Sequence, residues 1–221
     1  MDPETTNLDN LRPEEIRVLG ALIEKSVTTP DYYPLTLNSL TTACNQKSAR
    51  KPVVNYGTQE VILTLDSLQK KGYVTTESGA YSRSEKYEHR FNRKFELSSA
   101  QLAIMCLLFL RGPLTAGEIK SASGRLYAFE SLQEVHDNMN ELRNLETPLI
   151  KELPKQAGQK EQRSVHLFQN LESIEVESDE SNENISAVRQ PITEMEERIE
   201  KLENQVAELS EKLNKLLEEL N

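Results

Sequence analysis

The chain has no tryptophan, and aromatic residues make up only 5% of its 221 residues. This composition is more typical of small helical domains than of one large core. The chain has two cysteines, Cys44 and Cys106, and neither belongs to a CxxC pair. So few cysteines exclude a disulfide-stabilised scaffold and favour a reducing compartment.

No stretch of the sequence is long and apolar enough to cross a bilayer. The longest apolar run covers residues 102–110 and ends at Arg111, well short of the roughly 20 residues that a membrane-spanning helix needs. The N-terminal stretch MDPETTNLDN lacks the basic and apolar regions of a signal peptide. We therefore predict a cytoplasmic protein that does not contact a membrane.

Residues with catalytic chemistry are few and scattered. Neither cysteine has a histidine near it in the sequence, and no spacing of His, Cys and carboxylates indicates a zinc site. No glycine-rich stretch resembles a phosphate-binding loop. His89 and His166 lie near the ends of expected strands, where a structural role is the simpler interpretation. We predict no enzymatic activity, no cofactor and no metal.

The formal net charge of −10 is concentrated at one end of the chain. Residues 171–221 hold 15 Asp or Glu and 5 Lys or Arg, so they account for the whole excess. Residues 47–94, in contrast, hold 10 Lys or Arg and 5 Asp or Glu. A weakly basic zone followed by an acidic end indicates distinct interaction surfaces.

Hydrophobic spacing predicts three helices and a β-hairpin in the first 97 residues. Pro13 suits the first position of a helix, Thr36 and Thr58 suit N-caps, and Gly72 suits the left-handed residue after a helix. Period-two alternation then predicts two strands. The predicted helices are Pro13–Lys25, Leu37–Asn45 and Thr58–Lys71, and the predicted strands are Tyr73–Glu77 and Tyr81–Phe91.

The same order of elements recurs in the next part of the chain. Ser98, Thr115 and Ser131 each begin a capping box, with Gln or Glu three residues later, before an apolar periodic stretch. The first two of these helices are predicted to end at Arg111 and Ala122. Two strands, Leu149–Leu153 and Arg163–Phe168, are predicted after the third helix.

Helix, short helix, longer helix and hairpin is the order of a winged helix-turn-helix. The predicted fold class is therefore mainly α with small β-hairpins (α+β), built from two tandem winged helix-turn-helix domains and a C-terminal coiled-coil helix. We place the first domain at 1–97 and the second at 98–170. Residues 171–190 are a polar, acidic linker that cannot bury enough apolar surface to fold. Residues 191–221 form the coiled-coil helix.

The C-terminal stretch repeats apolar residues at alternating spacings of three and four, which is a coiled-coil heptad. The β-branched residues fall mostly at a positions and the leucines at d, a pattern that favours a parallel dimer, although a trimer or tetramer stays open. An amphipathic helix that folds back on its own domain is the alternative. The oligomerisation residues are Ile192, Met195, Ile199, Leu202, Val206, Leu209, Leu213, Leu216 and Leu220.

Several motifs resemble those of the YceH-like family of bacterial proteins. The motifs are EK-x-VTTPD-x-YPLTLN at Glu24–Asn38, ACNQKS at Ala43–Ser48, R-x-x-KYEHRF at Arg83–Phe91, LLFLRGP-x-TAGEI at Leu107–Ile119, LI-x-x-LP at Leu149–Pro154 and KE-x-R-x-x-HLF at Lys160–Phe168. The resemblance covers residues 13–168 and implies two tandem winged-helix domains with no assigned molecular activity. The sequence departs from the family at Tyr56-Gly57-Thr58 and Ser84-Glu85.

The first domain has candidate nucleic-acid-binding residues in two places. Cations in the loop before the third helix and in the hairpin would meet phosphates, and two amides would meet base edges. However, this loop is longer than a helix-turn-helix turn, and the third helix also has Glu60 and Asp66. The candidate residues for duplex DNA are Asn45, Gln46, Lys47, Arg50, Lys51, Arg83, Lys86 and Arg90.

The second domain favours a protein partner. Its third helix has Glu134, Asp137 and Glu141, with Glu130 just before it and only Arg143 to oppose them. DNA phosphates would repel this acidic face. Two functions therefore stay open: DNA binding through the first domain, as in a transcription regulator, or a protein–protein interaction scaffold that uses the same fold without DNA.

Overall fold

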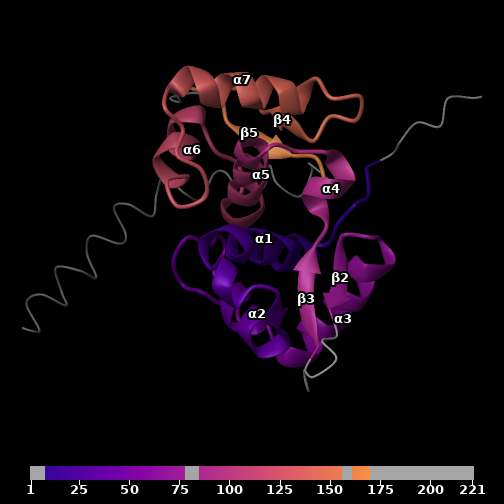
Figure 1. The fold of residues 1–221 in the computed structure, drawn as a ribbon. Helices are drawn as coiled ribbons and strands as arrows, with labels where there is room; N and C mark the ends of the chain where they lie inside the picture. The colour runs from indigo at the N-terminus through magenta and orange to yellow at the C-terminus, as the bar shows by residue number, and fades with distance from the viewer. Residues whose placement is uncertain (1–7, 78–84, 156–160, 170–221) are drawn as a thin grey trace, which may run out of the picture. The chain divides into compact units, whose positions relative to one another are not determined.

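A computed structural model describes residues 8–77, 85–155 and 161–169, which belong to one compact unit of mixed α+β structure (Figure 1). The N-terminal half, up to residue 97, contains α1 (Pro13–Thr28), a 3₁₀ turn η1 (Pro30–Tyr32), β1 (Leu35–Thr36), α2 (Leu37–Cys44), α3 (Thr58–Lys70), β2 (Val74–Glu77), β3 (Lys86–His89) and α4 (Phe91–Phe95). The C-terminal half, from residue 98, contains α5 (Ser99–Arg111), α6 (Ala116–Ala122), α7 (Leu132–Arg143), β4 (Ile150–Glu152) and β5 (Ser164–His166).

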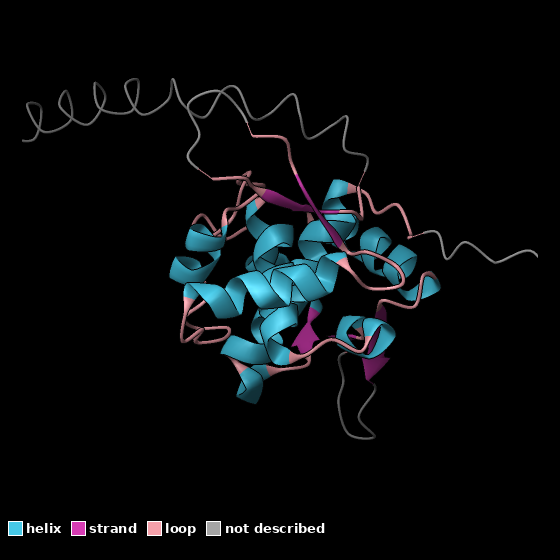
Figure 2. Ribbon diagram, turned by 90° about the horizontal axis from the view of Figure 1, so that it is seen from above, coloured by secondary structure: helices cyan, strands magenta, loops and turns pink. Residues whose placement is uncertain are grey.

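Each half has its own small antiparallel sheet beside its helices (Figure 2). In the N-terminal half the strand order is β1-β3-β2, so the short β1 pairs with the far edge of the hairpin, with Leu35 opposite Tyr87. In the C-terminal half β4 pairs with β5, and Leu114 extends this sheet by a bridge to Ser164. The described part of the chain thus shows the predicted order of three helices and a strand pair in each half.

The helix starts follow the predicted caps with one exception. Ser98 and Gln101 satisfy each other's backbone N–H groups in a capping box, and Thr115 does the same with Glu118. Ser131 caps its helix by accepting from the N–H of Glu134 at 3.0 Å, but the predicted capping box is only half formed, because the Glu134 carboxylate accepts from the N–H of Glu130 instead. The predicted cap at Thr58 is wrong, because Gly57 is the N-cap and Thr58 is already helical.

Two predicted boundaries also need correction. Helix α1 continues past Lys25 to Thr28, whose hydroxyl donates to the carbonyl of Glu24 at 2.9 Å. The second strand of the hairpin ends at His89 rather than Phe91, since the chain then turns into α4, which the sequence did not predict. The spacing of Phe91 and Phe95 fits one face of a short helix as well as it fits a strand end.

Helix α1 is surrounded by other elements, because α2 and α3 cover one side and α5 of the other half covers another. Every residue from Glu15 to Ile23 is buried. The two helices approach closely at Gly20, where an added Cβ would lie 2.9 Å from Cδ2 of Leu110. Glycine is therefore required here by space, and a larger residue would push α5 away.

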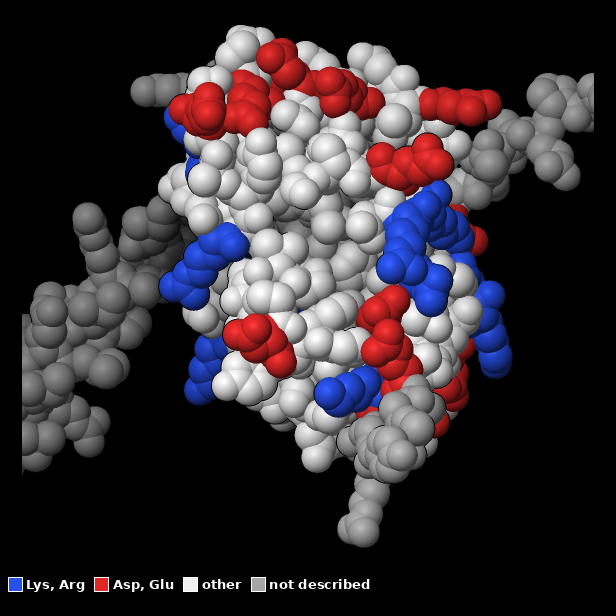
Figure 3. Space-filling view, in the orientation of Figure 1, with Lys and Arg blue, Asp and Glu red and all other residues white. Residues whose placement is uncertain are grey.

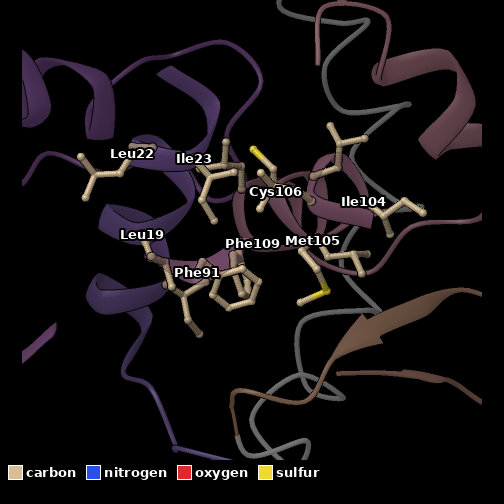
Figure 4. Packing of buried hydrophobic residues seen from close by; sticks show 14 of the residues in the cluster. Leu19, Leu22, Ile23, Phe91, Ile104, Met105, Cys106 and Phe109 are labelled. Carbon is tan, nitrogen blue, oxygen red and sulfur yellow. The ribbon is translucent and has the colours of Figure 1, made fainter. Parts of the chain in front are cut away.

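The core is continuous between the two halves (Figure 4). Ile23 of α1 lies near Cys106 of α5, and the rings of Phe91 and Phe109 are 5.3 Å apart, centroid to centroid. Phe168, at the end of the C-terminal half, packs 5.4 Å from Phe91. A domain boundary at 97/98 stays a prediction, but any such domains share one hydrophobic core.

The predicted linker and coiled-coil helix, residues 171–190 and 191–221, lie outside the described residues. Among the helices that the structure does describe, none has the length and apolar character needed to cross a membrane.

Candidate functional site

The loop of residues 46–57, which joins α2 to α3, is where the sequence placed four of its eight candidate DNA-binding residues. Arg50 in this loop is buried, and its side chain has no exposed area. Its guanidinium pairs with the Glu24 carboxylate of α1, with Nη2 at 2.6 Å from Oε2, and Nη2 also donates to the carbonyl of Ala43 at 3.1 Å. The prediction that Arg50 contacts phosphate is thus at odds with its place in the interior.

The ion pair sets the charge state of Glu24. Burial by itself would raise the pKa of this carboxyl, but the hydrogen bond and the positive charge of Arg50 outweigh burial and hold the pKa below its usual value. Glu24 is therefore ionised at neutral pH, and each partner neutralises the other. The pair fixes the loop to α1.

The two amides predicted to read bases are also occupied within the protein. Asn45 accepts from the N–H of Tyr56 at 2.7 Å and donates to its carbonyl at 2.9 Å, so its amide joins the two ends of the loop. Gln46 accepts from Nη2 of Arg50 at 3.0 Å through Oε1. The polar residues around the turn thus order the loop.

Arg17 of α1 completes this internal network, and sequence reasoning missed it. Its side chain donates to the carbonyls of Cys44 at 3.3 Å and Pro52 at 2.5 Å, and no carboxylate among the described residues pairs with it. The carbonyl of Cys44 belongs to the C-terminal end of α2, where the helix dipole favours a cation. The sequence predicted that one apolar face of α1 is buried, but it did not predict that the face with Arg17 is covered as well.

The remaining predicted cations lie at the surface. Lys47 and Lys51 are exposed in the loop. Lys86 is half-buried on β3, and Arg90 is exposed with its Nη2 3.9 Å from the Glu88 carboxylate. Arg83 lies outside the described residues. The loop and the hairpin therefore keep separate cations at the surface, while the half-buried amides of Asn45 and Gln46 bond within the protein.

His89 has a structural place at the end of β3. Its Nε2 lies 3.0 Å from the hydroxyl of Ser26, and its backbone N–H donates to the hydroxyl of Tyr33 at 2.7 Å. Its Nδ1 is buried without a hydrogen-bond partner. Burial, aided by the positive charge of Arg93, lowers the pKa of His89 to about 4. His89 is therefore neutral near pH 7.

The other reactive side chains are also withdrawn from solvent. Burial raises the pKa of the Cys44 thiol to about 12, and burial likewise raises the pKa of Cys106. His166 is buried against Phe109, with 5.0 Å between ring centroids, and burial lowers its pKa to about 4. Neutral thiols held in the core are poor nucleophiles. Within the described ranges, no group of His, Cys, Asp and Glu is placed to hold a metal ion.

Helix α3 presents a ridge of alternating charge and apolar character. Glu60, Leu63 and Asp66 are three residues apart, so they follow one another along one face of the helix, and all are exposed. Leu63 keeps 59% of its surface accessible. The opposite face packs into the core through Val61 and Leu65. We call Glu60, Leu63 and Asp66 the α3 ridge.

Helix α7 presents an acidic surface, as the sequence predicted. Figure 3 shows acidic side chains gathered over this helix at the top of the view. Asp137 and Glu141 are exposed on α7, and Glu130 is exposed just before it. Arg143 is paired with Glu152 of β4, so its charge is already compensated.

The chain resembles proteins from several bacteria. The family model described as "Protein of unknown function, DUF480" matches residues 11–159. A UPF0502 protein of Shewanella halifaxensis is 47% identical over 172 residues, which are 76% of this chain and 80% of that protein. A UPF0502 protein of Opitutus terrae is 47% identical over 161 residues, which are 72% of this chain and 70% of that protein.

Proposed function

The chain belongs to the bacterial family DUF480, and from this premise we propose that it is a non-enzymatic protein-interaction scaffold made of two tandem winged-helix domains. The order of elements supports the fold assignment. In the N-terminal half, three helices precede a strand pair whose second strand, β3, is central in the sheet and also pairs with β1. The C-terminal half repeats three helices and a strand pair. This order agrees with the one expected of a winged helix-turn-helix, which supports the proposed fold.

One observation favours a scaffold over a DNA-binding protein. The Arg50 guanidinium, which the sequence predicted to meet phosphate, is held in the interior by Glu24. DNA binding depends on cations that release counterions from the phosphate backbone, and a buried, neutralised cation releases none. Helix α3, the helix that a winged helix inserts into the major groove, presents Glu60 and Asp66 instead.

The states of the reactive side chains support a non-enzymatic role. The two thiols are buried and protonated, His166 is buried and neutral, and His89 is half-buried and neutral. A catalytic group needs contact with substrate and a pKa near the working pH. These four side chains therefore contribute to packing and hydrogen bonding within the protein.

A salt titration of DNA binding tests the proposal. We expect the full-length chain to bind a non-specific duplex only weakly at low ionic strength, with no steep loss as salt is added. If the surface cations did bind phosphate, the affinity would fall with a log–log slope of about −0.9 per contact, or about −4 for four contacts. Electrophoretic mobility shift or fluorescence anisotropy measures this slope.

The matched variant replaces the four predicted DNA-binding cations that the structure describes at or near the surface, Lys47, Lys51, Lys86 and Arg90, each with Glu. The scaffold proposal expects wild type and variant to bind the duplex equally poorly. Tight binding by the wild type that falls steeply with salt and is lost in the variant would reject the scaffold and assign DNA binding to the loop and hairpin.

We also propose that the heptad residues from Ile192 to Leu220 assemble the chain into a homo-oligomer, with a parallel dimer favoured by β-branched a positions and leucine d positions. An isolated helix of this length is marginal in water, which favours pairing. Light scattering should therefore give the full-length chain at least twice its monomer mass. A version that ends at Phe168 should be a monomer; equal oligomeric states for both would reject the coiled coil as the assembly element.

A further inference from the structure

The α3 ridge has the form of a docking surface. A single exposed leucine is ordinary on a protein surface. On this helix, however, Leu63 keeps 59% of its surface accessible between two exposed carboxylates, one turn before it and one turn after it. No ion pair to Glu60 or Asp66 forms within the described part of the chain, so both charges are free to meet a partner.

The charges on the ridge exclude two candidate occupants. If a second copy packed its own α3 antiparallel about Leu63, Glu60 of each copy would face Asp66 of the other, and a parallel arrangement would set Glu60 against Glu60. In both arrangements, the packing of the two helices that covers Leu63 also brings carboxylates of the two copies together, and these repel each other. Duplex DNA would bring phosphates against the same carboxylates.

The ridge fits a partner of the opposite pattern. We propose that Glu60, Leu63 and Asp66 dock a basic amphipathic helix of a partner protein, in which an apolar side chain lies between two Lys or Arg residues about one turn away on either side. The apolar side chain covers Leu63, and the two cations pair with the two carboxylates. This mode is helix-face recognition, read through residues at i, i+3 and i+6. The inference rests on the proposed scaffold function and names the chemistry of its partner.

Such a contact is small, and its affinity and salt dependence follow from the two charge pairs and the central apolar contact. Charge pairs at the rim of an interface govern the rate of association and its salt dependence, while the central apolar contact is shielded from water by them. We therefore expect weak, salt-sensitive binding by one copy. Several linked copies would strengthen it through avidity if the partner is also multivalent.

Two synthetic helical peptides of defined chemistry serve as probes. One has the pattern Lys-x-x-Leu-x-x-Lys on an alanine-rich helix, and the other differs only by Glu in place of both Lys. Fluorescence anisotropy follows each labelled peptide as the full-length chain is titrated in. We expect the basic peptide to bind at low salt, to lose most of its affinity at about 0.5 M salt, and to bind more tightly than the acidic peptide.

Because the whole chain is acidic, general attraction must be separated from docking. The variant Leu63→Ser leaves the net charge unchanged. It should lower the affinity for the basic peptide by about tenfold or more. The double variant Glu60→Lys, Asp66→Lys should reverse the preference toward the acidic peptide. The matched control Asp137→Lys, Glu141→Lys makes the same charge change on α7 and should keep the original preference.

The outcomes separate this inference from the scaffold function. If Leu63→Ser binds the basic peptide as well as the wild type does, or if the α7 control reverses the preference as fully as the α3 variant, the ridge is not the docking site. That result leaves the scaffold proposal standing, because DNA binding is measured independently. Steep, salt-dependent DNA binding would reject the scaffold whichever peptide binds.

Discussion

Replacing Arg50 with methionine is expected to destabilise the folded chain by about 3 kcal/mol, near the lower end of the range for breaking a buried ion pair. Methionine fills much of the same space, but it leaves the Glu24 carboxylate without the partner that lies 2.6 Å away in the wild type. It also removes the donors to the carbonyl of Ala43. Because 15% of the Glu24 side chain is exposed and Lys25 Nζ lies 3.4 Å from its Oε2, water and Lys25 relieve part of this cost. Urea denaturation monitored by circular dichroism gives the free energy of unfolding.

Two further variants decide between the structural role of Arg50 and a surface role. Lys51→Met changes the next residue, which is exposed, and should alter stability by no more than about 0.5 kcal/mol. The double variant Arg50→Met, Glu24→Gln removes the stranded charge and should recover part of the loss, so the two sites should couple. If Arg50→Met were as mild as Lys51→Met, Arg50 would be a surface cation, and the case against DNA binding would fall with it.

The sequence predicted what depends on local signals. The α5 and α6 capping boxes at Ser98 and Thr115 need only residues within one turn, and both are present. Gly72, predicted as a left-handed residue after α3, has φ of 75°. Periodicity located the helices in both halves, since an amphipathic helix must direct its apolar stripe inward wherever its partners lie.

The features that the sequence did not predict depend on contacts between residues that are distant in the chain. Arg50 looked like a surface cation in a polar loop, and only the fold brings it to Glu24, 26 residues earlier. Arg17 could be recognised as buried only once the end of α2 and the loop after it were known to pack against α1, where the carbonyls of Cys44 and Pro52 accept from it. The α3 ridge was visible in part, because Glu60 and Asp66 had already argued against DNA. The exposure of Leu63 depends on which face of α3 packs against the core.

Two histidines with lowered pKa values, His89 and His166, predict the pH dependence of stability. His89 and His166 have a folded-state pKa of about 4, against an ordinary value of 6.5. Each is neutral in the folded chain, with Nδ1 buried and without a hydrogen-bond partner, so a proton taken up there gains no acceptor. In the unfolded chain both histidines are hydrated and take up a proton as the pH falls through 6.5.

The sign follows from this difference. Between pH 6.5 and pH 4 the unfolded chain binds more protons than the folded chain, so the free energy of unfolding falls as the pH is lowered. The contribution of the two histidines to the free energy of unfolding is complete above their unfolded-state pKa of 6.5. It is lost as the pH drops through their folded-state pKa of about 4. Two such groups should remove about 3 kcal/mol between pH 7 and pH 5. Carboxylates with lowered pKa, Glu24 among them, add their loss in a more acidic range.

Urea titrations at several pH values measure this slope, and single variants assign it. His89→Gln retains a group that can bond to the Ser26 hydroxyl but cannot take up a proton, so it should remove about half of the pH dependence while leaving the fold intact. His136→Gln serves as the control, because His136 is exposed on α7 and should leave the slope unchanged. A free energy of unfolding that stays constant from pH 7 to pH 5 would show that protons reach both rings in the folded chain, and that the packing around Phe109 and Ser26 opens to water.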